Sequence, residues 1–352
     1  LIRPRNNAYK SAGERYIKNK MSEENREQIK AYLNAIWDYA AENMAKSRHL
    51  DVTVLNNMVS SLDACLPEDA LRNTLVDKLS FRSDVQDLIC EEVRTKYKLG
   101  NKTKVSFVKY SDYRKTMPDI FLPQKENIAV VYAFGDVNRG KGSELSIGSE
   151  TIVKALQKAA ANKRIKAIVL RVNSPGGDAI ASELITNEVI KAKKKKPVIV
   201  SMGDVAASAG YEMSSNATKI VASPITITGS IGVFGVMPNF ARSLKKNLGI
   251  TFDTVKTHDN SIALTVTSPV SQDVKSMMQR NVENFYDNFI TRVATGRKKD
   301  KAYIDSIARG RVWAGSQAKE LGLVDEFGGL RKAVELAAKE AGIKSSYGIV
   351  AY

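Results

Sequence analysis

The stretch from Pro197 to Tyr211 reads PVIVSMGDVAASAGY and decides the fold class of this chain. Its apolar front half predicts a short buried strand that breaks at Gly203, and its small residues predict a helix that opens beside Ser208. A strand end fixes the position of a side chain, and a helix start offers free backbone N–H groups next to it. Ser208 therefore has the setting that a nucleophilic serine needs.

A second apolar strand precedes this one in the chain. It covers Ala167–Val172 and leads into the turn Asn173–Gly177, which reads NSPGG. The glycines of such a turn let bare backbone approach a ligand. Ser-Pro-Gly-Gly alone is an ordinary turn, but its place at the end of a buried strand favours a functional role. The two strand ends together indicate a nucleophile and an oxyanion hole.

The pattern around these strands predicts an α/β domain. Apolar strands alternate with helical segments, which is the βαβ pattern of a parallel sheet. The 352 residues, 43% of them hydrophobic, suffice for a sizeable core and about two domains. Runs of eighteen or more apolar residues do not occur. The predicted strands are 127–134, 166–172, 197–202, 219–222 and 225–234, and the predicted helices of this part are 150–162, 178–196 and 271–295.

The basic composition does not by itself indicate nucleic acid. The formal net charge is +16, and the run Lys191–Lys196 is the densest group of cations. Cations favour a helix C-terminus, and Pro197 would stop the helix directly after them. Aromatic residues do not interleave the run, so a nucleic-acid site is not expected.

The side-chain inventory narrows the chemistry open to Ser208. A serine hydroxyl needs a base, most often histidine, but His49 and His258 both lie in segments that predict an exposed surface position. Cys65 and Cys90 lack the close ligand spacing of a zinc site. A carboxylate or a lysine remains, and a lysine serves as a base once burial lowers its pKa.

An internal repeat singles out one lysine. Residues 35–48 align with residues 284–297, and residues 75–79 align with 323–327 at nearly the same offset. We therefore expect residues 1–104 to be the closing part of a first repeat that lacks its front, and residues 105–352 to be a complete second repeat. Leu1 is not a start methionine, which fits a chain that begins inside a domain. At the same offset the first copy has Lys10 where the second has no lysine. The two repeats would therefore each supply one of the catalytic groups.

Four segments give the chain a resemblance to a known family. They are Arg171–Gly177, Val200–Tyr211, Thr228–Gly235 and Tyr9–Ala12. The chain resembles signal peptide peptidase A in its long, two-repeat bacterial form over nearly its whole length. The resemblance implies an α/β fold of ClpP/crotonase-like repeated βαβ units, with one complete copy and the C-terminal part of a second. It also implies a serine-lysine peptidase that degrades cleaved signal peptides and other short apolar peptides at the membrane.

The resemblance assigns roles to the positions that match the family motifs. Ser208 matches the nucleophile, Lys10 matches the general base from the first repeat, and Ser230 matches a hydroxyl that holds the lysine amine. No metal and no cofactor are implied.

The same motifs supply the oxyanion hole. Gly177 and the N–H of Ala209 match its donors, with Gly176 beside them. Some relatives have glycine where this chain has Ala209, and a backbone donor tolerates that change.

The resemblance also implies partners and a location. Relatives of the long form assemble as homo-oligomers, commonly tetramers. They are anchored in the bacterial inner membrane by a segment ahead of the first repeat, which is absent from this chain, with the catalytic body on the periplasmic side. The expected partners are signal-peptide remnants, other peptides and further copies of the chain.

Two alternatives stay open on the sequence alone. A crotonase-type acyl-CoA enzyme shares the superfold and its glycine-built oxyanion hole, but it uses carboxylates and no covalent serine. A non-catalytic scaffold fragment is the other alternative, because a chain that lacks half a repeat would have lost part of its cleft.

Overall fold

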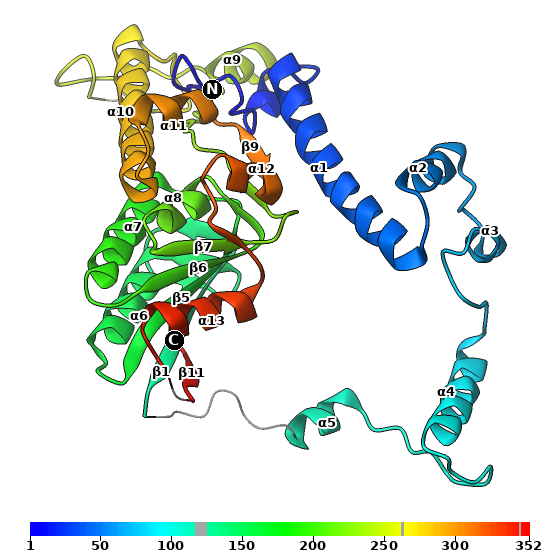
Figure 1. Ribbon diagram of the computed structural model, residues 1–352. Coiled ribbons are helices and arrows are strands. Elements are labelled where there is room, and N and C mark those ends of the chain that lie inside the picture. The colour runs from blue at the N-terminus through cyan, green and yellow to red at the C-terminus, as the bar shows by residue number, and fades with distance from the viewer. Residues whose placement is uncertain (117–124, 262–263, 345) are drawn as a thin grey trace. The chain divides into compact units, whose positions relative to one another are not determined.

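The part of the molecule that contains Ser208 is built around a mostly parallel sheet (Figure 1). The computed structural model describes residues 1–116, 125–261, 264–344 and 346–352. Within them the sheet has eight strands, and its main path runs β10-β7-β6-β5-β1-β11 with every neighbouring pair parallel. The bounds on this path are β1 Asn127–Phe134, β5 Ile165–Ser174, β6 Val198–Ala207, β7 Lys219–Ala222, β10 Glu326–Phe327 and β11 Gly348–Ala351.

Two apolar cores lie on opposite faces of this sheet. Alternate residues of β1 and β5 pack against different helices, because successive side chains of a strand point to opposite faces. One core includes α6 (Ser149–Ala161), α7 (Ala179–Lys193), α8 (Ala209–Ser215) and α10 (Gln272–Arg297), and the other includes α13 (Leu330–Glu340). Figure 1 shows α6 and α7 on one side of the sheet and α13 on the other. Burial on both faces explains why these strands read as continuous apolar runs.

The predicted break at Gly203 is wrong. Strand β6 continues through Gly203 to Ala207, and it changes neighbour there, from β7 at Ile199–Ser201 to β8 (Ile227–Gly229) at Val205–Ala207. A Cβ at position 203 would lie 2.8 Å from the Asn173 side chain, so a glycine is needed for close approach of β5. The longer strand carries Ser208 directly at its carboxyl end.

The strand predicted over 225–234 is also shorter than expected. Strand β8 spans only Ile227–Gly229 and pairs antiparallel with β9 (Val312–Ala314). Gly229 and Ser230 both have positive φ, 77° and 49°, which ends the extended conformation. Ser230 therefore lies in a turn after the strand.

The remaining elements of this unit are short. The glycine-containing loop after β1 forms a small sheet in the order β2-β4-β3. Helices α9, α11 and α12 connect the later strands. Their bounds are β2 Asp136–Asn138, β3 Gly142–Ser143, β4 Ser146–Gly148, α9 Ala241–Leu248, α11 Lys301–Ile307 and α12 Gly315–Glu320.

The chain forms two units, and the first 36 residues belong with the sheet. The larger unit contains Leu1–Ile36 and Phe121–Tyr352, and the smaller one contains Trp37–Ile120. The N-terminal segment has a short 3-10 helix (Glu14–Tyr16) and the start of α1 (Glu23–Arg48), and Ile2 pairs with Gly235. Helices α1 and α10 are both 26 residues long and stand at the offset of the proposed repeat. The repeat boundary at 104/105 stays a prediction.

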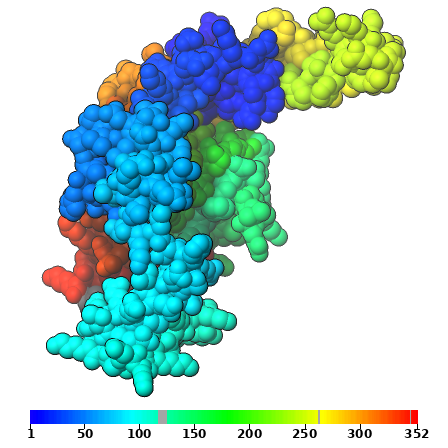
Figure 2. Space-filling model, turned by 90° about the vertical axis from the view of Figure 1, so that its right-hand side faces the viewer, coloured from blue at the N-terminus to red at the C-terminus, as the bar shows by residue number. Residues whose placement is uncertain are grey.

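The smaller unit is helical (Figure 2, blue to cyan). Among its described residues, α3, α4 and α5 have no buried side chain. Its helices after α1 are α2 Val52–Ser61, α3 Pro67–Arg72, α4 Arg82–Lys96 and α5 Tyr110–Thr116. Its two cysteines, Cys65 and Cys90, are not bonded to each other.

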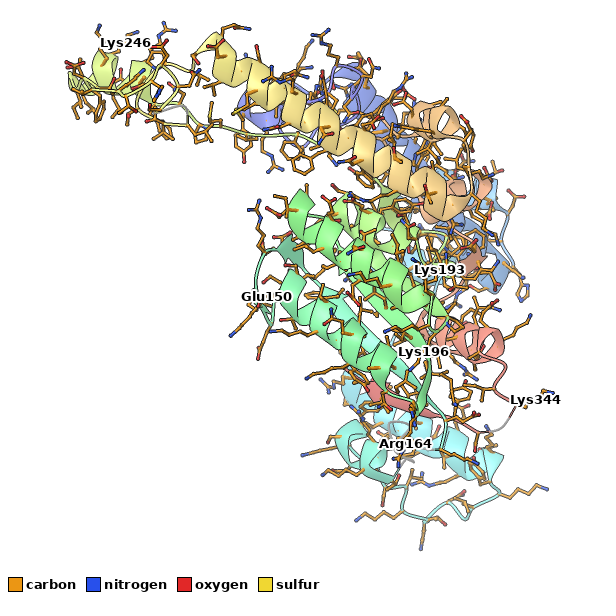
Figure 3. All side chains as sticks on the ribbon, turned by 90° about the vertical axis from the view of Figure 1, so that its left-hand side faces the viewer. Glu150, Arg164, Lys193, Lys196, Lys246 and Lys344 are labelled. Atoms are coloured by element: carbon orange, nitrogen blue, oxygen red, sulfur yellow. The ribbon has the colours of Figure 1, made fainter. Side chains whose placement is uncertain are left out.

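The basic run at 191–196 closes α7, as predicted (Figure 3). The Lys193 Nζ donates to the Ala217 carbonyl at 3.1 Å, and the Lys196 Nζ donates to the Ala159 carbonyl at 3.0 Å. Partial burial lowers the pKa of both amines. These two lysines bind the ends of neighbouring helices.

Candidate active site

Ser208 lies between β6 and α8 in a conformation that is rare for a residue with a side chain. Its φ is 54° and its ψ is −122°. The backbone is held there by the Ser208 N–H, which donates to the Gly229 carbonyl at 2.9 Å. Strained residues of this kind persist where the surrounding structure fixes them, and they concentrate at functional sites. The turn leaves the Ser208 side chain partly exposed.

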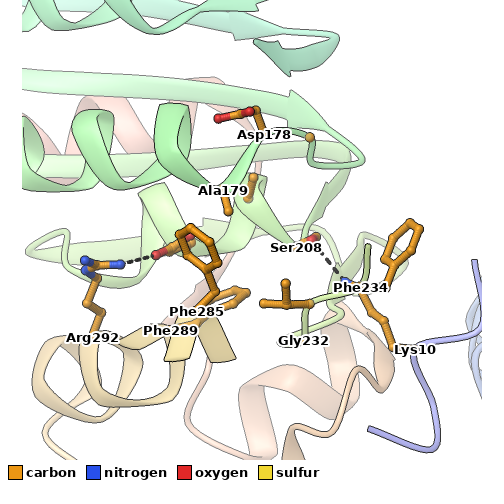
Figure 4. Close-up of a pocket in the computed structure, with 13 residues that line it drawn as sticks. Lys10, Asp178, Ala179, Ser208, Gly232, Phe234, Phe285, Phe289 and Arg292 are labelled. Atoms are coloured by element: carbon orange, nitrogen blue, oxygen red, sulfur yellow. Dashed lines mark hydrogen bonds and ion pairs between the residues drawn. The ribbon is translucent and has the colours of Figure 1, made fainter. Parts of the chain in front are cut away.

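The structure brings Lys10 next to Ser208, although 198 residues separate them. The Lys10 Nζ lies 3.0 Å from the Ser208 Oγ (Figure 4). It also lies 2.9 Å from the Ser230 Oγ and 2.8 Å from the Ser230 carbonyl oxygen. These three oxygens are the hydrogen-bond partners that the structure gives the amine, and none belongs to a carboxylate.

Burial allows the Lys10 amine to be neutral near pH 7. The residue is only 4% exposed. Desolvation disfavours the ammonium form and lowers the pKa of Lys10 from 10.5 to about 7. Near pH 7 about half of the molecules would therefore carry a neutral amine that can accept a proton.

The turn after β5 lies directly against Ser208. Gly176 and Gly177 have φ of 117° and 152°, and a Cβ on Gly176 would lie 2.7 Å from the Ser208 Cβ. Val137 donates to the Gly176 carbonyl and accepts from the Asp178 N–H, so the Gly177 N–H points away from Val137. The Ala209 N–H starts α8 and has no acceptor within that helix. Gly177 and Ala209 thus offer two N–H groups beside the serine.

Gly176 lies beside these two donors and makes a different contact. Its N–H donates to the Ser174 Oγ at 3.2 Å inside the turn. That bond occupies the donor, so Gly176 contributes close packing against Ser208 and no free N–H.

A cavity of about 260 Å³ opens beside Ser208 and Lys10. Apolar and charged side chains both line it, and Figure 4 shows Phe285 and Phe289 of α10 between Ser208 and Arg292. A second hollow that also borders Ser208 and Lys10 is lined by Tyr9, Pro175 and Gly177 among others. Ser208 and Lys10 thus border both hollows. The apolar residues that line the first cavity are Ala179, Ala209, Val233, Phe234, Phe285 and Phe289.

A buried ion pair closes the far end of that cavity. Glu212 accepts from the Ser182 hydroxyl at 2.7 Å and from Arg292 at 2.8 Å, and Arg292 also bonds Glu183. Burial raises the pKa of the Glu212 carboxyl.

The cavity draws its larger apolar residues from two distant segments of the chain. Val233 and Phe234, which follow β8 in the chain, line the cavity, whereas Ile231 is fully buried and Val236 is exposed on the surface. The contribution of α10 was missed, because Phe285 and Phe289 have the i, i+4 spacing of any core-facing helix.

The described parts of the chain lack a buried histidine base, a cluster of metal ligands and a helix that could span a membrane. His49 and His258 are exposed, as predicted. Groups of three or more His, Cys, Asp or Glu side chains placed to hold a metal ion do not occur among the described residues. Within the same ranges, helices long and apolar enough to cross a bilayer are likewise not found.

Comparison with known proteins identifies the class. The sequence profile of Peptidase family S49 matches residues 4–96 and 190–344, and that of Clp protease matches residues 144–226. The chain belongs to Peptidase family S49 and has its α/β, Clp-like fold.

Individual relatives agree with this assignment. The chain is 36% identical over 342 residues to Protease 4 of Haemophilus influenzae, covering 94% of this chain and 54% of that protein. It is 30% identical over 344 residues to the chloroplastic Serine protease SPPA of Arabidopsis thaliana, covering 95% and 50%. It is 35% identical over 192 residues to the Putative signal peptide peptidase SppA of Enterococcus faecium, covering 54% and 56%. The chain thus spans about half the length of these relatives.

Proposed function

We propose that this chain is a serine endopeptidase in which Ser208 and Lys10 form a catalytic dyad. The observation that carries the proposal is the 3.0 Å separation of the Lys10 Nζ and the Ser208 Oγ around a buried amine. A lysine whose pKa is about 7 can act as a general base at neutral pH. Membership in Peptidase family S49 supports the reaction class.

The proposed reaction begins with proton transfer. Neutral Lys10 takes the proton of the Ser208 hydroxyl while the Oγ forms a bond to the peptide carbonyl carbon. The carbonyl oxygen becomes an oxyanion, which accepts from the N–H groups of Gly177 and Ala209. Each such donor is worth roughly 3 kcal/mol in the transition state.

Collapse of this intermediate breaks the C–N bond. The Lys10 ammonium then gives its proton to the leaving amine, and an acyl group remains on the Ser208 Oγ. A water molecule, deprotonated by Lys10, attacks the ester carbonyl and releases the carboxylic acid product and the free serine. Ser230 holds the amine in place through these steps with its hydroxyl and its carbonyl oxygen.

The substrates we propose are short apolar peptides, including cleaved signal peptides. Aliphatic and aromatic side chains (Val233, Phe234, Phe285 and Phe289) line part of the cavity beside Ser208 and support this choice. So does the name of the Enterococcus faecium relative, a putative signal peptide peptidase. The membrane location, the periplasmic side and the homo-oligomer are proposals that rest on the family resemblance.

The division of labour between two repeats is part of the same proposal. Lys10 lies in the segment assigned to the first repeat and Ser208 lies in the second. The matching lengths and positions of α1 and α10 support this assignment.

Peptide hydrolysis by two variants tests the dyad. We expect Ser208→Ala and Lys10→Ala each to lower the hydrolysis of a fluorogenic apolar peptide on the order of 10⁴-fold or more, because members of such a unit fail together. Lys20→Ala, an exposed lysine of the same segment, is the matched control and should retain full activity. Substantial turnover by Lys10→Ala would remove the lysine from the mechanism.

Covalent labelling separates the peptidase from an acyl-CoA enzyme. A fluorophosphonate probe should modify Ser208 and no other serine. A chain that ignores the probe, and cleaves no member of a peptide library, would favour a CoA enzyme or a non-catalytic scaffold.

A further inference from the structure

A group of aromatic and charged side chains holds the segment that carries Lys10. We call Tyr9, Glu27, Arg311 and Trp313 the Arg311 cluster. The Arg311 guanidinium carbon lies 4.8 Å from the centre of the Tyr9 ring and 4.3 Å from the Trp313 ring. The Arg311 guanidinium also pairs with Glu27 of α1 at 2.9 Å, and the Tyr9 hydroxyl donates to the same carboxylate at 2.9 Å. A planar cation between two rings fixes the Tyr9 ring from one side.

The backbone of Arg311 binds Ser230, the residue that holds the amine of Lys10. The Arg311 carbonyl accepts from the Ser230 N–H at 2.7 Å. Ser230 in turn supplies two of the three oxygens that hold the Lys10 amine. Arg311 therefore contacts the residue before Lys10 with its side chain and the residue that holds the amine with its main chain.

The segment has little other regular structure to hold it. Residues 6–13 contain neither helix nor strand. The Tyr9 N–H donates to the Arg309 carbonyl, and Gln28 bridges the Tyr9 carbonyl to the Val312 N–H. Both contacts lead to the residues that flank Arg311. The placement of Lys10 thus depends on this short stretch of chain before and within β9.

We propose that Arg311 is a positioning residue that sets the distance between the Lys10 amine and the Ser208 hydroxyl by clamping Tyr9. The inference rests on the proposed dyad and goes beyond it, because Arg311 touches neither the substrate nor the reacting atoms. Removal of the guanidinium frees the Tyr9 ring, lets water reach Lys10 and lengthens the Lys10–Ser208 contact.

The rate at which a fluorophosphonate labels Ser208 tests this role without a chosen peptide. Arg311→Met keeps the length of the side chain and removes its charge and its planar fork. We expect it to slow labelling at pH 7 about 10- to 100-fold, the loss that a displacement of about 1 Å produces. The midpoint of the pH profile should move up by about one unit, because a wetter Lys10 holds its proton more firmly.

Three further variants separate positioning from mere stability. Arg311→Lys keeps the cation and should recover part of the rate. Glu27→Gln removes only the ion pair at an exposed carboxylate. The midpoint of the pH profile of labelling should shift in the same direction as in Arg311→Met, but by less. Arg331→Met changes an arginine that is 93% exposed and should behave like the unaltered protein.

The outcomes are distinguishable. An Arg311→Met protein that keeps the unaltered rate and midpoint overturns the inference. So does a rate that falls only in proportion to the folded fraction, measured by circular dichroism, while the midpoint stays fixed. If Lys10→Ala labels as fast as the unaltered protein, the proposed dyad itself fails, whatever Arg311→Met does.

Discussion

Ser208 and Lys10 meet at one point but are held there in different ways. Ser208 lies at the carboxyl end of a buried strand, between the main sheet and α8, with the turn at Gly176 packed against it. Lys10 lies in a segment without helix or strand that depends on side-chain contacts to Arg311 and Gln28. The nucleophile is thus fixed by the core of the fold, whereas the base is held by a few contacts that can be removed singly.

The largest loss of activity is expected from a new Cβ packed against Ser208, the rigidly held member of the dyad. Gly176→Ala would place a Cβ 2.7 Å from the Ser208 Cβ at a φ of 117°, and neither the strand nor the turn can move away. We expect peptide hydrolysis to fall about 10³-fold or more, because both the nucleophile and the oxyanion donors would be displaced.

The control for this variant is Gly140→Ala, which has the same kind of backbone strain but no atom within 4 Å of the new Cβ. It should remain nearly fully active. Equal losses in the two variants would mean that backbone strain, and not packing on Ser208, explains the effect.

A smaller loss of activity is expected from a glycine-to-alanine change next to Lys10. Gly310→Ala would place a Cβ 2.5 Å from the Lys10 Cβ at a φ of 83°. The Lys10 segment can shift, so kcat should fall only about 10- to 100-fold, with KM little changed. A loss as large as that of Gly176→Ala would show that the two sides of the dyad are equally rigid.

Removal of the Ser230 hydroxyl should cost less again. Ser230→Ala leaves the Lys10 amine its bonds to the Ser230 carbonyl and to the Ser208 Oγ. Loss of one hydrogen bond corresponds to about tenfold in kcat. Steady-state kinetics that show a loss comparable to that of Lys10→Ala would give the Ser230 hydroxyl a direct part in proton transfer.

Burial of the Lys10 amine should lower the free energy of unfolding in a pH-dependent way. The pKa of Lys10 is about 7 when folded and 10.5 for the ordinary side chain, so between these pH values the unfolded chain binds more protons. The stability contributed by Lys10 therefore rises with pH from 7 to 10.5, and its burial is most unfavourable below pH 7. Lys10→Met should raise the free energy of unfolding by about 1–3 kcal/mol at pH 7, and the gain should shrink as pH approaches 10.5.

Urea unfolding at several pH values measures this difference. The exposed Lys20→Met variant is the control and should show no such pH-dependent gain. A Lys10→Met gain that is the same at pH 7 and pH 10 would contradict a folded pKa near 7.

The same contrast explains what the sequence could predict. Strand β1, strand β7 and helix α10 match their predicted ranges to within about two residues, because continuous apolar runs and 3.6-residue periodicity are local signals. The setting of Ser208 between a strand and a helix was also a local signal. Strands β10 and β11 were missed, since segments of two and four residues carry too little pattern.

The rest of the site depends on contacts between distant residues. Nothing near Lys10 in the sequence marks it as buried, and only the internal repeat and the family resemblance singled it out. The Arg311 cluster joins residues 9, 27, 311 and 313, which no local pattern connects. The end of β8 at Gly229 was missed because the positive φ of Ser230 has no local signal and accompanies a hydrogen bond to the distant Arg311 carbonyl.

The most direct test of the dyad is the pH dependence of Ser208 phosphonylation from pH 5 to pH 10, in the unaltered protein and in Lys10→Ala. A neutral lysine as base predicts a rate that rises about tenfold per pH unit up to about pH 7 and then levels off, and a step that disappears in Lys10→Ala. The same profile in both proteins would contradict the account.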